Sequence, residues 1–394
     1  MGEESFIYHL WGHVKITCTI LLAVVTASLP AQTQAVRDSA GIRIVLNPAL
    51  STAKETFAFH PVPTYDVGGL EDDPVKEFKS NQGYLRGVFL SDGTLAVTDE
   101  WRMQFFDSKA RRLGILGAKG GGPEDFSYLV GICRTRGDTI VTYDSRNSRN
   151  AVVSPTRKVV RTLPATVNGG LTFSSCFDDG TIVLSHSDFD RATAMSTTRY
   201  VRVRLDGTIV NPLLIEPTRF DMVTFAENAV ATAGQRFYHG LPDASQITAY
   251  DATGKPALIV RFADKAERIA DADAMSRIGY AMPAGGGKPT DAQVAAAKAD
   301  AMERWKSRPH AEFWPTHGRI HVDDLGRLWV NQYQKDTKAP DVWVAFAPDG
   351  QMIGKLVLPA GRKEVIGFAK NGILVRTSDS DGAAHLELHS ITKP

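Results

Sequence analysis

Between residues 83 and 126, short apolar runs alternate with small groups of turn residues. Asp and Gly dominate the breaks, as in Ser91-Asp92-Gly93, because both tolerate the positive φ and local side-chain bonding that tight turns need. A four-stranded meander of this kind cannot bury both of its faces alone, so it needs similar neighbours. The pattern predicts antiparallel strands at Leu85–Leu90, Thr94–Thr98, Met103–Phe106 and Leu113–Leu116.

The turn and the strand after it recur along the chain. The first copy is Asp92-Gly93-Thr94-Leu95-Ala96-Val97, and its glycine is followed by counterparts at intervals of 44, 43, 54, 92 and 46 residues. Four-stranded propeller blades repeat every ~40–50 residues, so most of these intervals hold one blade. The glycines that mark the repeats are Gly93, Gly137, Gly180, Gly234, Gly326 and Gly372.

The 92-residue interval contains a segment of different character, residues 264–310. It is rich in alanine, lacks Asp-Gly turns, and carries the capping-box pattern Thr290-Asp291-Ala292-Gln293 after the flexible break Ala284–Lys288. We therefore expect a helix from Thr290 to about Trp305, within a helical insertion between blades four and five. Apolar positions at helical spacing, which would pack against the blades or dock a partner, are Val294, Ala297, Ala301 and Trp305.

The two ends of the propeller are predicted to meet in one blade. Gly41–Asn47 and Phe57–Gly69 read as strands, and the last repeat offers only three strands, ending near Leu386–Ile391. We expect an N-terminal strand, Thr64–Gly68, to complete this blade, because ring closure hides edges that would otherwise pair with other chains. The predicted fold is an all-β, six-bladed propeller of four-stranded antiparallel blades over residues 36–394.

Composition and charge narrow the class of partner. Hydrophobic residues make up 43% of the chain and charged residues 23%, which is enough for an ordinary globular core. The formal net charge is +1, and no Lys/Arg cluster stands out. Because nucleic-acid binding needs a strongly basic surface, we expect no nucleic-acid partner.

The N-terminal residues 1–35 are typical of a signal peptide. Lys15 precedes an apolar run of 14 residues, Ile16–Leu29, which is too short for a bilayer span of ~20 residues. Pro30 ends the run, and Thr33-Gln34-Ala35 places small residues at a cleavage site. We expect a periplasmic or secreted protein with no stable membrane span after cleavage; an uncleaved anchor is the alternative.

Cleavage would leave two cysteines, Cys133 and Cys176. Both fall on strands at equivalent places in adjacent repeats, and an oxidising compartment would allow them to pair. Spacing alone does not fix the geometry of a disulfide, so we expect two buried free thiols and keep the disulfide as the alternative.

Several motifs resemble the NHL-type six-bladed β-propellers of bacterial secreted proteins, in particular an uncharacterised group with a G-x-G-P-G-E-F loop. The matching loop is Gly120–Phe126, in which Glu124 stands where the group has Gly and Asp125 where it has Glu. Val67-Gly68-Gly69 and Asp324–Val330 are also similar to the group. The resemblance extends over residues 41–391. It implies the fold but says little about function, because different propellers bind ligands, hydrolyse substrates, act as lyases or serve as scaffolds.

Candidate binding residues lie on the predicted inner strands and on the loops of one face. Arginine forks carboxylates and phosphates, and sugars or peptides stack on Trp, so this set favours a small anionic ligand, a glycan or a protein partner. Bracing between blades is the alternative for Asp144–Arg149, because NHL repeats often carry Asp-x-x-Asn-x-Arg there. The predicted binding residues are Arg86, Trp101, Arg102, Lys119, Asp144, Arg146, Arg149, Arg319 and His321.

Signals for catalysis or a metal are weak. The sequence has no G-x-S-x-G elbow and no H-E-x-x-H helix. His186–Asp190 and Asp379–Gly382 offer oxygen ligands, but ordinary solvated turns explain them better than a calcium loop. We expect a binding module without cofactor or catalysis. A lactonase- or esterase-like hydrolase with a divalent cation in the central channel is the alternative, and an envelope scaffold that docks a partner through 264–310 is a third possibility.

Overall fold

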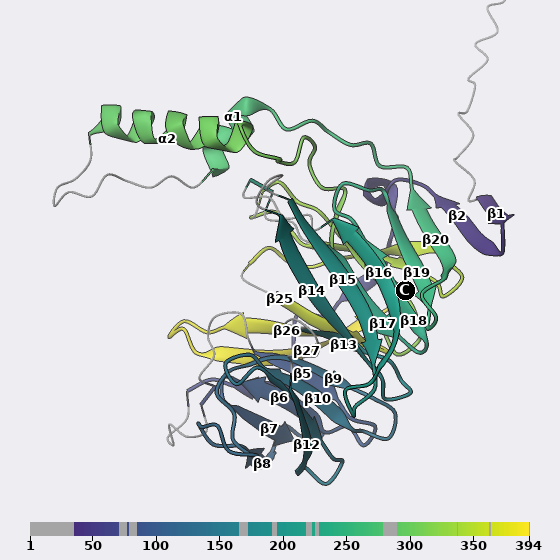
Figure 1. Cartoon of the computed structure of the whole chain (residues 1–394), viewed down its shortest axis with the longest axis vertical. Helices are drawn as coiled ribbons and strands as arrows, with labels where there is room; N and C mark the ends of the chain where they lie inside the picture. The colour runs from purple at the N-terminus through teal and green to yellow at the C-terminus, as the bar shows by residue number, and fades with distance from the viewer. Residues whose placement is uncertain are drawn as a thin grey trace, which may run out of the picture. The chain divides into compact units, whose positions relative to one another are not determined.

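The first repeat folds as a four-stranded antiparallel sheet in sequence order (Figure 1). Its strands are β5 (Arg86–Phe89), β6 (Leu95–Asp99), β7 (Arg102–Phe106) and β8 (Arg112–Leu116), close to the predicted boundaries. At the first turn Gly93 has φ 83°, and the Asp92 carboxylate accepts a hydrogen bond from the Thr94 amide at 2.8 Å. The Asp-Gly turn therefore works as the sequence predicts.

The computed structural model describes residues 35–70, 77–78, 85–164, 172–190, 195–217, 223–224, 228–278, 290–336, 338–361 and 364–393. Residues 1–34 of the predicted signal peptide lie outside this range, and so does the predicted break at Ala284–Lys288. Within the described part, no helix is both long and apolar enough to cross a lipid bilayer.

The later repeats form further antiparallel units with their strands in sequence order. The second and third are β9 (Leu129–Arg134), β10 (Ile140–Asp144), β11 (Arg149–Val153), β12 (Val159–Pro164), and β13 (Thr172–Cys176), β14 (Ile182–Asp190), β15 (Met195–Val203), β16 (Ile209–Pro217). Next come β17 (Ala229–Ala233), β18 (Arg236–Gly240), β19 (Gln246–Asp251), β20 (Pro256–Phe262), and β21 (His317–Val322), β22 (Leu328–Gln332), β23 (Val342–Phe346), β24 (Met352–Val357). The last is β25 (Glu364–Ala369), β26 (Gly372–Ser378) and β27 (Ala384–Thr392).

The first strand of each unit, which we call its inner strand, contacts the inner strand of the next. β5 contacts β9, β9 contacts β13, β13 contacts β17, β17 contacts β21, β21 contacts β25, and β25 returns to β5. Small antiparallel sheets arranged around a closed circuit of inner strands are the blades of a β-propeller. The fold is all-β, and the predicted propeller class is confirmed.

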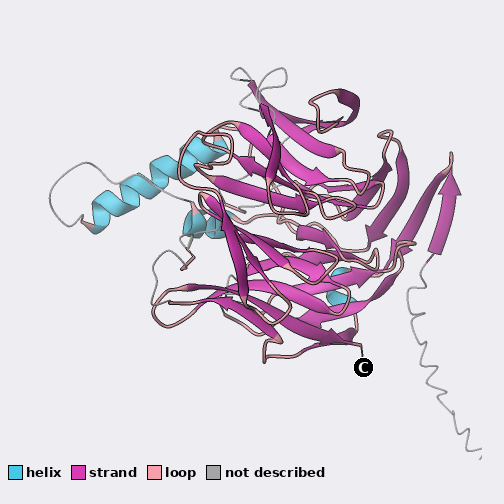
Figure 2. Ribbon diagram, turned by 90° about the horizontal axis from the view of Figure 1, so that it is seen from below, coloured by secondary structure: helices cyan, strands magenta, loops and turns pink. Residues whose placement is uncertain are grey.

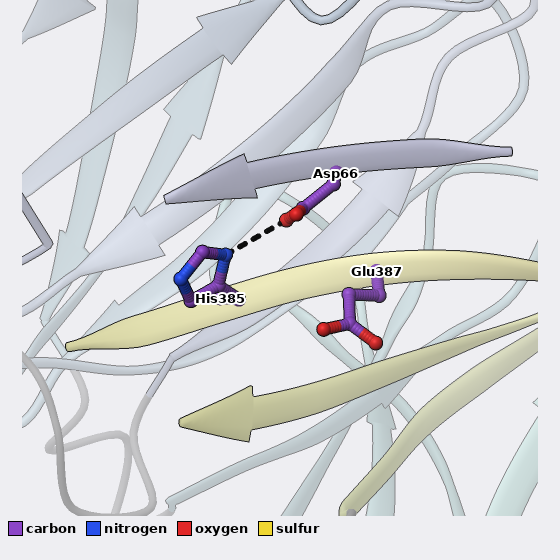
Figure 3. Close-up of side chains that lie close together, drawn as sticks. All are labelled: Asp66, His385 and Glu387. Carbon is purple, nitrogen blue, oxygen red and sulfur yellow. Dashed lines mark hydrogen bonds and ion pairs between the residues drawn. The ribbon is translucent and has the colours of Figure 1, made fainter. Parts of the chain in front are cut away.

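N-terminal strands complete and connect the outer edges of the blades. β4 (Tyr65–Gly68) pairs antiparallel with β27, as predicted for the closing strand, and Figure 3 shows these two strands side by side. The predicted strand Phe57–Gly69 is broken: β3 (Glu55–Phe59) instead pairs with β24 and β27 and joins two blades into one nine-stranded sheet. Pro61 and Pro63 lie in the break, where a missing N–H donor is tolerated.

Two further strands extend the blade that ends with β20. β2 (Ile42–Asn47) pairs parallel with β20, and β1 (Ala35–Ser39) pairs antiparallel with β2, which gives a six-stranded sheet. The predicted strand Gly41–Asn47 is therefore present, whereas β1 is an addition. A short 3₁₀ turn, η1 (Leu50–Thr52), follows β2 and buries Leu50.

Apolar clusters lie between neighbouring blades. Trp329 and Trp343 are fully buried and pack with Phe368 of the following blade; the rings of Trp329 and Phe368 stack with centroids 4.4 Å apart. Both tryptophans therefore belong to the core between blades. Burying large aromatic surfaces at such contacts, at ~25 cal/mol per Å², stabilises the ring as a whole.

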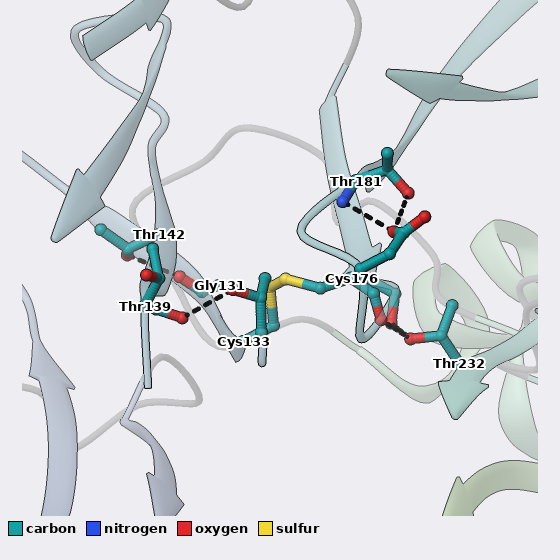
Figure 4. The surroundings of a disulfide bond; sticks show 10 residues. Gly131, Cys133, Thr139, Thr142, Cys176, Thr181 and Thr232 are labelled. Carbon is teal, nitrogen blue, oxygen red and sulfur yellow. Dashed lines mark hydrogen bonds between the residues drawn. A yellow bond between two sulfur atoms is a disulfide. The ribbon is translucent and has the colours of Figure 1, made fainter. Parts of the chain in front are cut away.

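Cys133 and Cys176 form a disulfide, so the expectation of free thiols is wrong (Figure 4). Cys133 lies near the end of β9 and Cys176 at the end of β13, and these inner strands contact each other. The two Cα atoms are 6.0 Å apart, which is within the range that a disulfide spans. The bond joins two neighbouring blades at their inner strands.

The helical insertion lies between β20 and β21, as predicted, and contains the helices α1 (Asp271–Arg277) and α2 (Asp291–Lys306) (Figure 2). Thr290 and Gln293 form the predicted capping box at the start of α2. The C-terminal half of α2 is held by a small core: Ala301 and Met302 are buried, and Trp305 packs beside them. Residues of this core outside α2 include Ile269, Ala274 and Trp314.

Candidate functional site

Three arginines converge on one carboxylate at the ends of the inner strands. Glu364 Oε1 lies 3.0 Å from Arg319 Nη1 and 3.3 Å from Arg86 Nη2, and its Oε2 lies 2.7 Å from Arg376 Nη2. We call these four residues the arginine site. The four side chains carry a net charge of +2, because three guanidinium groups surround one carboxylate.

The propeller topology explains why these residues meet. Glu364 is the first residue of β25 and Arg86 is the first of β5, so both lie where an inner strand begins. Arg319 lies near the start of β21. Since β25 contacts both β21 and β5, Glu364 sits between the two arginines. Arg376 is the direct cross-strand partner of Glu364 on β26.

The arginine site is partly open to solvent. The Arg319 side chain is 52% exposed and Arg86 is 32% exposed, whereas Arg376 and Glu364 are 19% and 21% exposed. Nη1 of Arg376 is buried and has no hydrogen-bond partner among the described residues. A buried donor without a partner is unfavourable. The hydrogen-bond acceptor of a bound ligand would satisfy this nitrogen.

His321, also on β21, lies close to the arginine site but does not add charge to it. Its ring packs against Trp343 and Phe368, with centroids 5.3 and 5.9 Å away. Burial, together with the charges of Arg319 and Arg86, lowers the pKa of His321 to about 3. The imidazole is therefore neutral at physiological pH.

The predicted pair Trp101 and Arg102 does not form a binding surface. Arg102 is fully buried, and its Nε donates to the Asp99 carboxylate at 2.9 Å. The same carboxylate accepts from Gln104 at 3.1 Å, and the guanidinium lies 5.1 Å from the centre of the Trp101 ring. Arg102 is thus a core ion pair beside a tryptophan, because the turn at Asp99–Arg102 folds inward rather than toward solvent.

Of the predicted set Asp144, Arg146 and Arg149, two residues, Asp144 and Arg149, brace the Gly120–Phe126 loop and the chain that follows it. Asp144 is buried and accepts hydrogen bonds from the Tyr128 amide at 2.9 Å and the Asn147 side chain at 2.7 Å. Arg149 donates to the carbonyls of Gly122 and Asp125 at 2.7 and 2.6 Å. The bracing alternative therefore describes Asp144 and Arg149 correctly.

Lys119 and Arg146 remain at the surface near this brace. Lys119 is exposed and its backbone bridges to Phe126. Arg146 is exposed and lies 5.9 Å from the centre of the Tyr128 ring. The structure brings neither residue together with Arg86, Arg319 and His321 in any contact among the described residues.

One group of side chains has the arrangement of metal ligands. Asp66, His385 and Glu387 each offer one ligand atom, and these atoms lie within 4.8 Å of one another (Figure 3). Among the described residues it is the only such group of three, and it lies on β4 and β27 rather than on inner strands. The run His186–Asp190, which was expected to be a solvated turn, is the end of strand β14.

Two members of the arginine site, Glu364 and Arg376, were missed from the sequence. Glu364 follows a stretch without an Asp-Gly turn, so no local signal marks it as the start of an inner strand. Arg376 lies four residues after the recognised Gly372, and the strand pattern there places it opposite Glu364. Pairing the recognised turn strand with its preceding inner strand would have found both.

Comparison with solved structures supports the fold. A candidate exported protein from Bacteroides fragilis is similar with a TM-score of 0.54 at 10% identity, over 89% of this chain and 99% of that chain. A member of the DUF4221 family from Bacteroides vulgatus is similar with a TM-score of 0.52 at 9% identity, over 86% and 100%. The architecture is that of a β-propeller.

A catalytically inactive virginiamycin B lyase from Staphylococcus aureus also matches, with a TM-score of 0.40 at 11% identity, over 80% of this chain and 83% of that chain. Neither protein-family models nor curated proteins match the sequence. At these identities the similarity shows the fold alone, so the function has to be argued from the chain's own residues.

Proposed function

We propose that the protein is an exported β-propeller that binds a small anionic ligand at the arginine site, without catalysis of its own. The observation that carries the proposal is the convergence of Arg86, Arg319 and Arg376 on the single carboxylate of Glu364. One carboxylate does not neutralise three guanidinium groups, so a second carboxylate or a phosphate would be bound favourably beside it.

The blade count supports the location of this site. We infer six blades, because the circuit of inner strands runs through β5, β9, β13, β17, β21 and β25 and closes on itself. In this count β4 is the fourth strand of the last blade. The arginine site then lies where the inner strands of the fifth, sixth and first blades begin, at one mouth of the central channel. Ligand sites are concave and commonly lie at such openings.

Export is supported by the disulfide between Cys133 and Cys176, since such bonds persist in oxidising compartments. The similar Bacteroides fragilis protein is itself described as a candidate exported protein. A periplasmic or secreted location agrees with the signal-peptide pattern of residues 1–35, which we retain as a prediction.

The ligand chemistry follows from the exposed and unpaired donors. Arg319 is the most exposed of the three arginines and would meet the ligand first, and the buried Nη1 of Arg376 would gain an acceptor. Arginine presents parallel N–H donors that match the two oxygens of a carboxylate or phosphate. Uronic acids and the C-terminal ends of peptides carry such a carboxylate, and phosphorylated small molecules carry such a phosphate.

Calorimetric titration of the purified protein with glucuronate and with inorganic phosphate tests the proposal. We expect Arg319→Gln and Arg376→Gln each to weaken binding at least tenfold, and Glu364→Gln to strengthen it because the competing carboxylate is removed. Arg111→Gln is the matched control, since Arg111 pairs with one carboxylate, Asp107, at an exposed site. Equal affinities of Arg319→Gln and the parent protein, or binding of neither probe, would refute the anion site.

A further inference from the structure

Asp66, His385 and Glu387 form a second polar site on β27 and β4, the two strands of the last blade that lie farthest from its inner strand β25. His385 and Glu387 alternate along β27, so their side chains share one face of the blade. Asp66 of β4 is the direct cross-strand partner of Glu387, and Gly68 is the partner of His385. Two strands thus bring one imidazole and two carboxylates together on one surface.

The opposite face of the same strands is apolar, which fixes the register. Leu386, between the two ligands, is fully buried and packs with Val67 and Leu374 in the core shared with the first blade. A slip of one residue would turn Leu386 outward and the ligands into this core. The burial of Leu386 therefore holds His385 and Glu387 on the opposite face of the strand from the core shared with the first blade.

The backbone next to the site is shaped to admit the His385 ring. Gly68 and Gly69 have φ of 120° and 84°, a region that favours glycine. A Cβ atom at Gly69 would lie 3.0 Å from Cε1 and 3.1 Å from Nε2 of His385, and one at Gly68 would overlap the Ala384 carbonyl. The Val67-Gly68-Gly69 run of the sequence thus lets β4 end tightly against the imidazole.

A second layer of hydrogen bonds orients the ligands. Thr377 Oγ1 donates to Glu387 Oε1 at 2.6 Å, and His389 Nε2 lies 2.8 Å from Glu387 Oε2. On the other side, Asp379 Oδ2 lies 3.4 Å from Nε2 of His385, while Nδ1 of the same ring faces the ligand Asp66, 2.9 Å from its Oδ1. Ligands held in this way by outer partners are characteristic of protein metal sites.

We propose that Asp66, His385 and Glu387 bind a divalent transition-metal ion, Zn²⁺. One imidazole nitrogen with two carboxylate oxygens suits Zn²⁺, whereas Ca²⁺ takes six to eight oxygen ligands. Asp66 is 43% exposed, while His385 and Glu387 are each 19% exposed, so the ion has a path from solvent and keeps positions for water. This site is distinct from the channel cation of the alternative hydrolase hypothesis, and it does not depend on the arginine site.

The alternative is an ion-pair network in which His385 merely bridges Asp66 and Asp379. Matched variants separate the two. His186 and Asp188 on β14 have the same two-residue spacing as His385 and Glu387, with a His–Asp contact of 2.8 Å, and they belong to no three-ligand group among the described residues. Asp188→Asn is therefore the control for Asp66→Asn and Glu387→Gln.

Chelator-treated, untagged protein should be titrated with Zn²⁺ against a chromophoric chelator. We expect one Zn²⁺ ion per protein molecule. The Zn²⁺ affinity should be at least tenfold weaker in Asp66→Asn and in Glu387→Gln, and within twofold of the parent protein in Asp188→Asn. Co²⁺ substitution should give visible absorption bands that the Glu387→Gln variant loses, and thermal melts should show that each variant folds.

Three results would overturn the proposal. One is the absence of Zn²⁺ binding to the folded parent protein. Another is an unchanged Zn²⁺ affinity in both Asp66→Asn and Glu387→Gln. The third is tighter binding of Ca²⁺ than of Zn²⁺, which would contradict the argument from the nitrogen and oxygen donors.

Discussion

His239 lies on β18, with its imidazole almost entirely buried. It packs against the rings of Tyr200 and Phe237, and Nδ1 lies 3.6 Å from Oε1 of Glu216. Burial, together with the nearby His317, lowers the pKa of His239 to about 4. The unfolded chain therefore binds more protons than the folded protein between about pH 6.5 and pH 4, so folding stability must fall as the pH falls through this window.

The His239→Gln variant should lose part of this pH dependence. A shift of about 2.5 pKa units corresponds to about 3 kcal/mol that the parent protein loses between pH 7 and pH 4 and the variant does not. Urea unfolding at several pH values measures the difference. The exposed His60, replaced by Gln, is the control and should keep the slope of the parent protein; equal slopes for His239→Gln and the parent protein would contradict the prediction.

At the residue scale, the sequence predicted positions better than contacts. Arg86, Arg319 and His321 are predicted binding residues on inner strands, and the structure brings these three together. Arg102 carries the same charge but is buried against Asp99. A short arginine-bearing turn does not reveal whether its side chain points outward or inward, because this depends on packing against distant parts of the chain.

At the element scale, α2 begins with a capping box that has little tertiary support. The backbone N–H of Gln293 donates to Thr290 Oγ1 at 3.3 Å, and the backbone N–H of Thr290 donates to Gln293 Oε1 at 2.9 Å. The buried residues of this helix, Ala301 and Met302, lie toward its other end. The first turns of α2 therefore depend on the cap.

The Thr290→Ala variant should weaken the start of α2 by about 1 kcal/mol. Hydrogen exchange should then become about fivefold faster for the amides at the start of Asp291–Lys306, with little change around Met302. Thr290→Ser keeps the capping oxygen and should behave like the parent protein. Equal exchange rates in Thr290→Ala and Thr290→Ser would show that the cap is not what holds this end.

The hairpin of β14 and β15 shows why one element was mispredicted. Residues His186–Asp190 are polar apart from Phe189, a composition that predicts a solvated turn, yet they pair in register with Met195–Arg199. Backbone pairing continues along an antiparallel hairpin even when the side chains give no apolar alternation. A polar strand that projects beyond the core is therefore easily read as a turn.

At the scale of the whole molecule, repetition made the fold predictable. Each repeat carries its own turn, so the order of the blades, the insertion and the pairing of β4 with β27 could all be predicted. The bridge made by β3 and the disulfide could not. Both depend on how neighbouring blades approach each other in space, which the spacing of residues along the chain does not determine.

The disulfide should contribute to the stability of the whole ring. It joins the inner strands β9 and β13 and closes a loop with a sequence separation of 43 residues, which in the chain-entropy account stabilises the folded state by about 4 kcal/mol, within a usual range of about 2–4. Replacing both cysteines by serine, or adding a reductant, should therefore lower the urea midpoint of the entire propeller. The reductant should have no further effect on the Cys133→Ser, Cys176→Ser double variant. Because the inner strands form a closed circuit, we expect hydrogen exchange to become faster in all blades together when the disulfide is removed. Faster exchange in β9–β16 alone would show that the loss of stability is confined to the two blades that the disulfide joins.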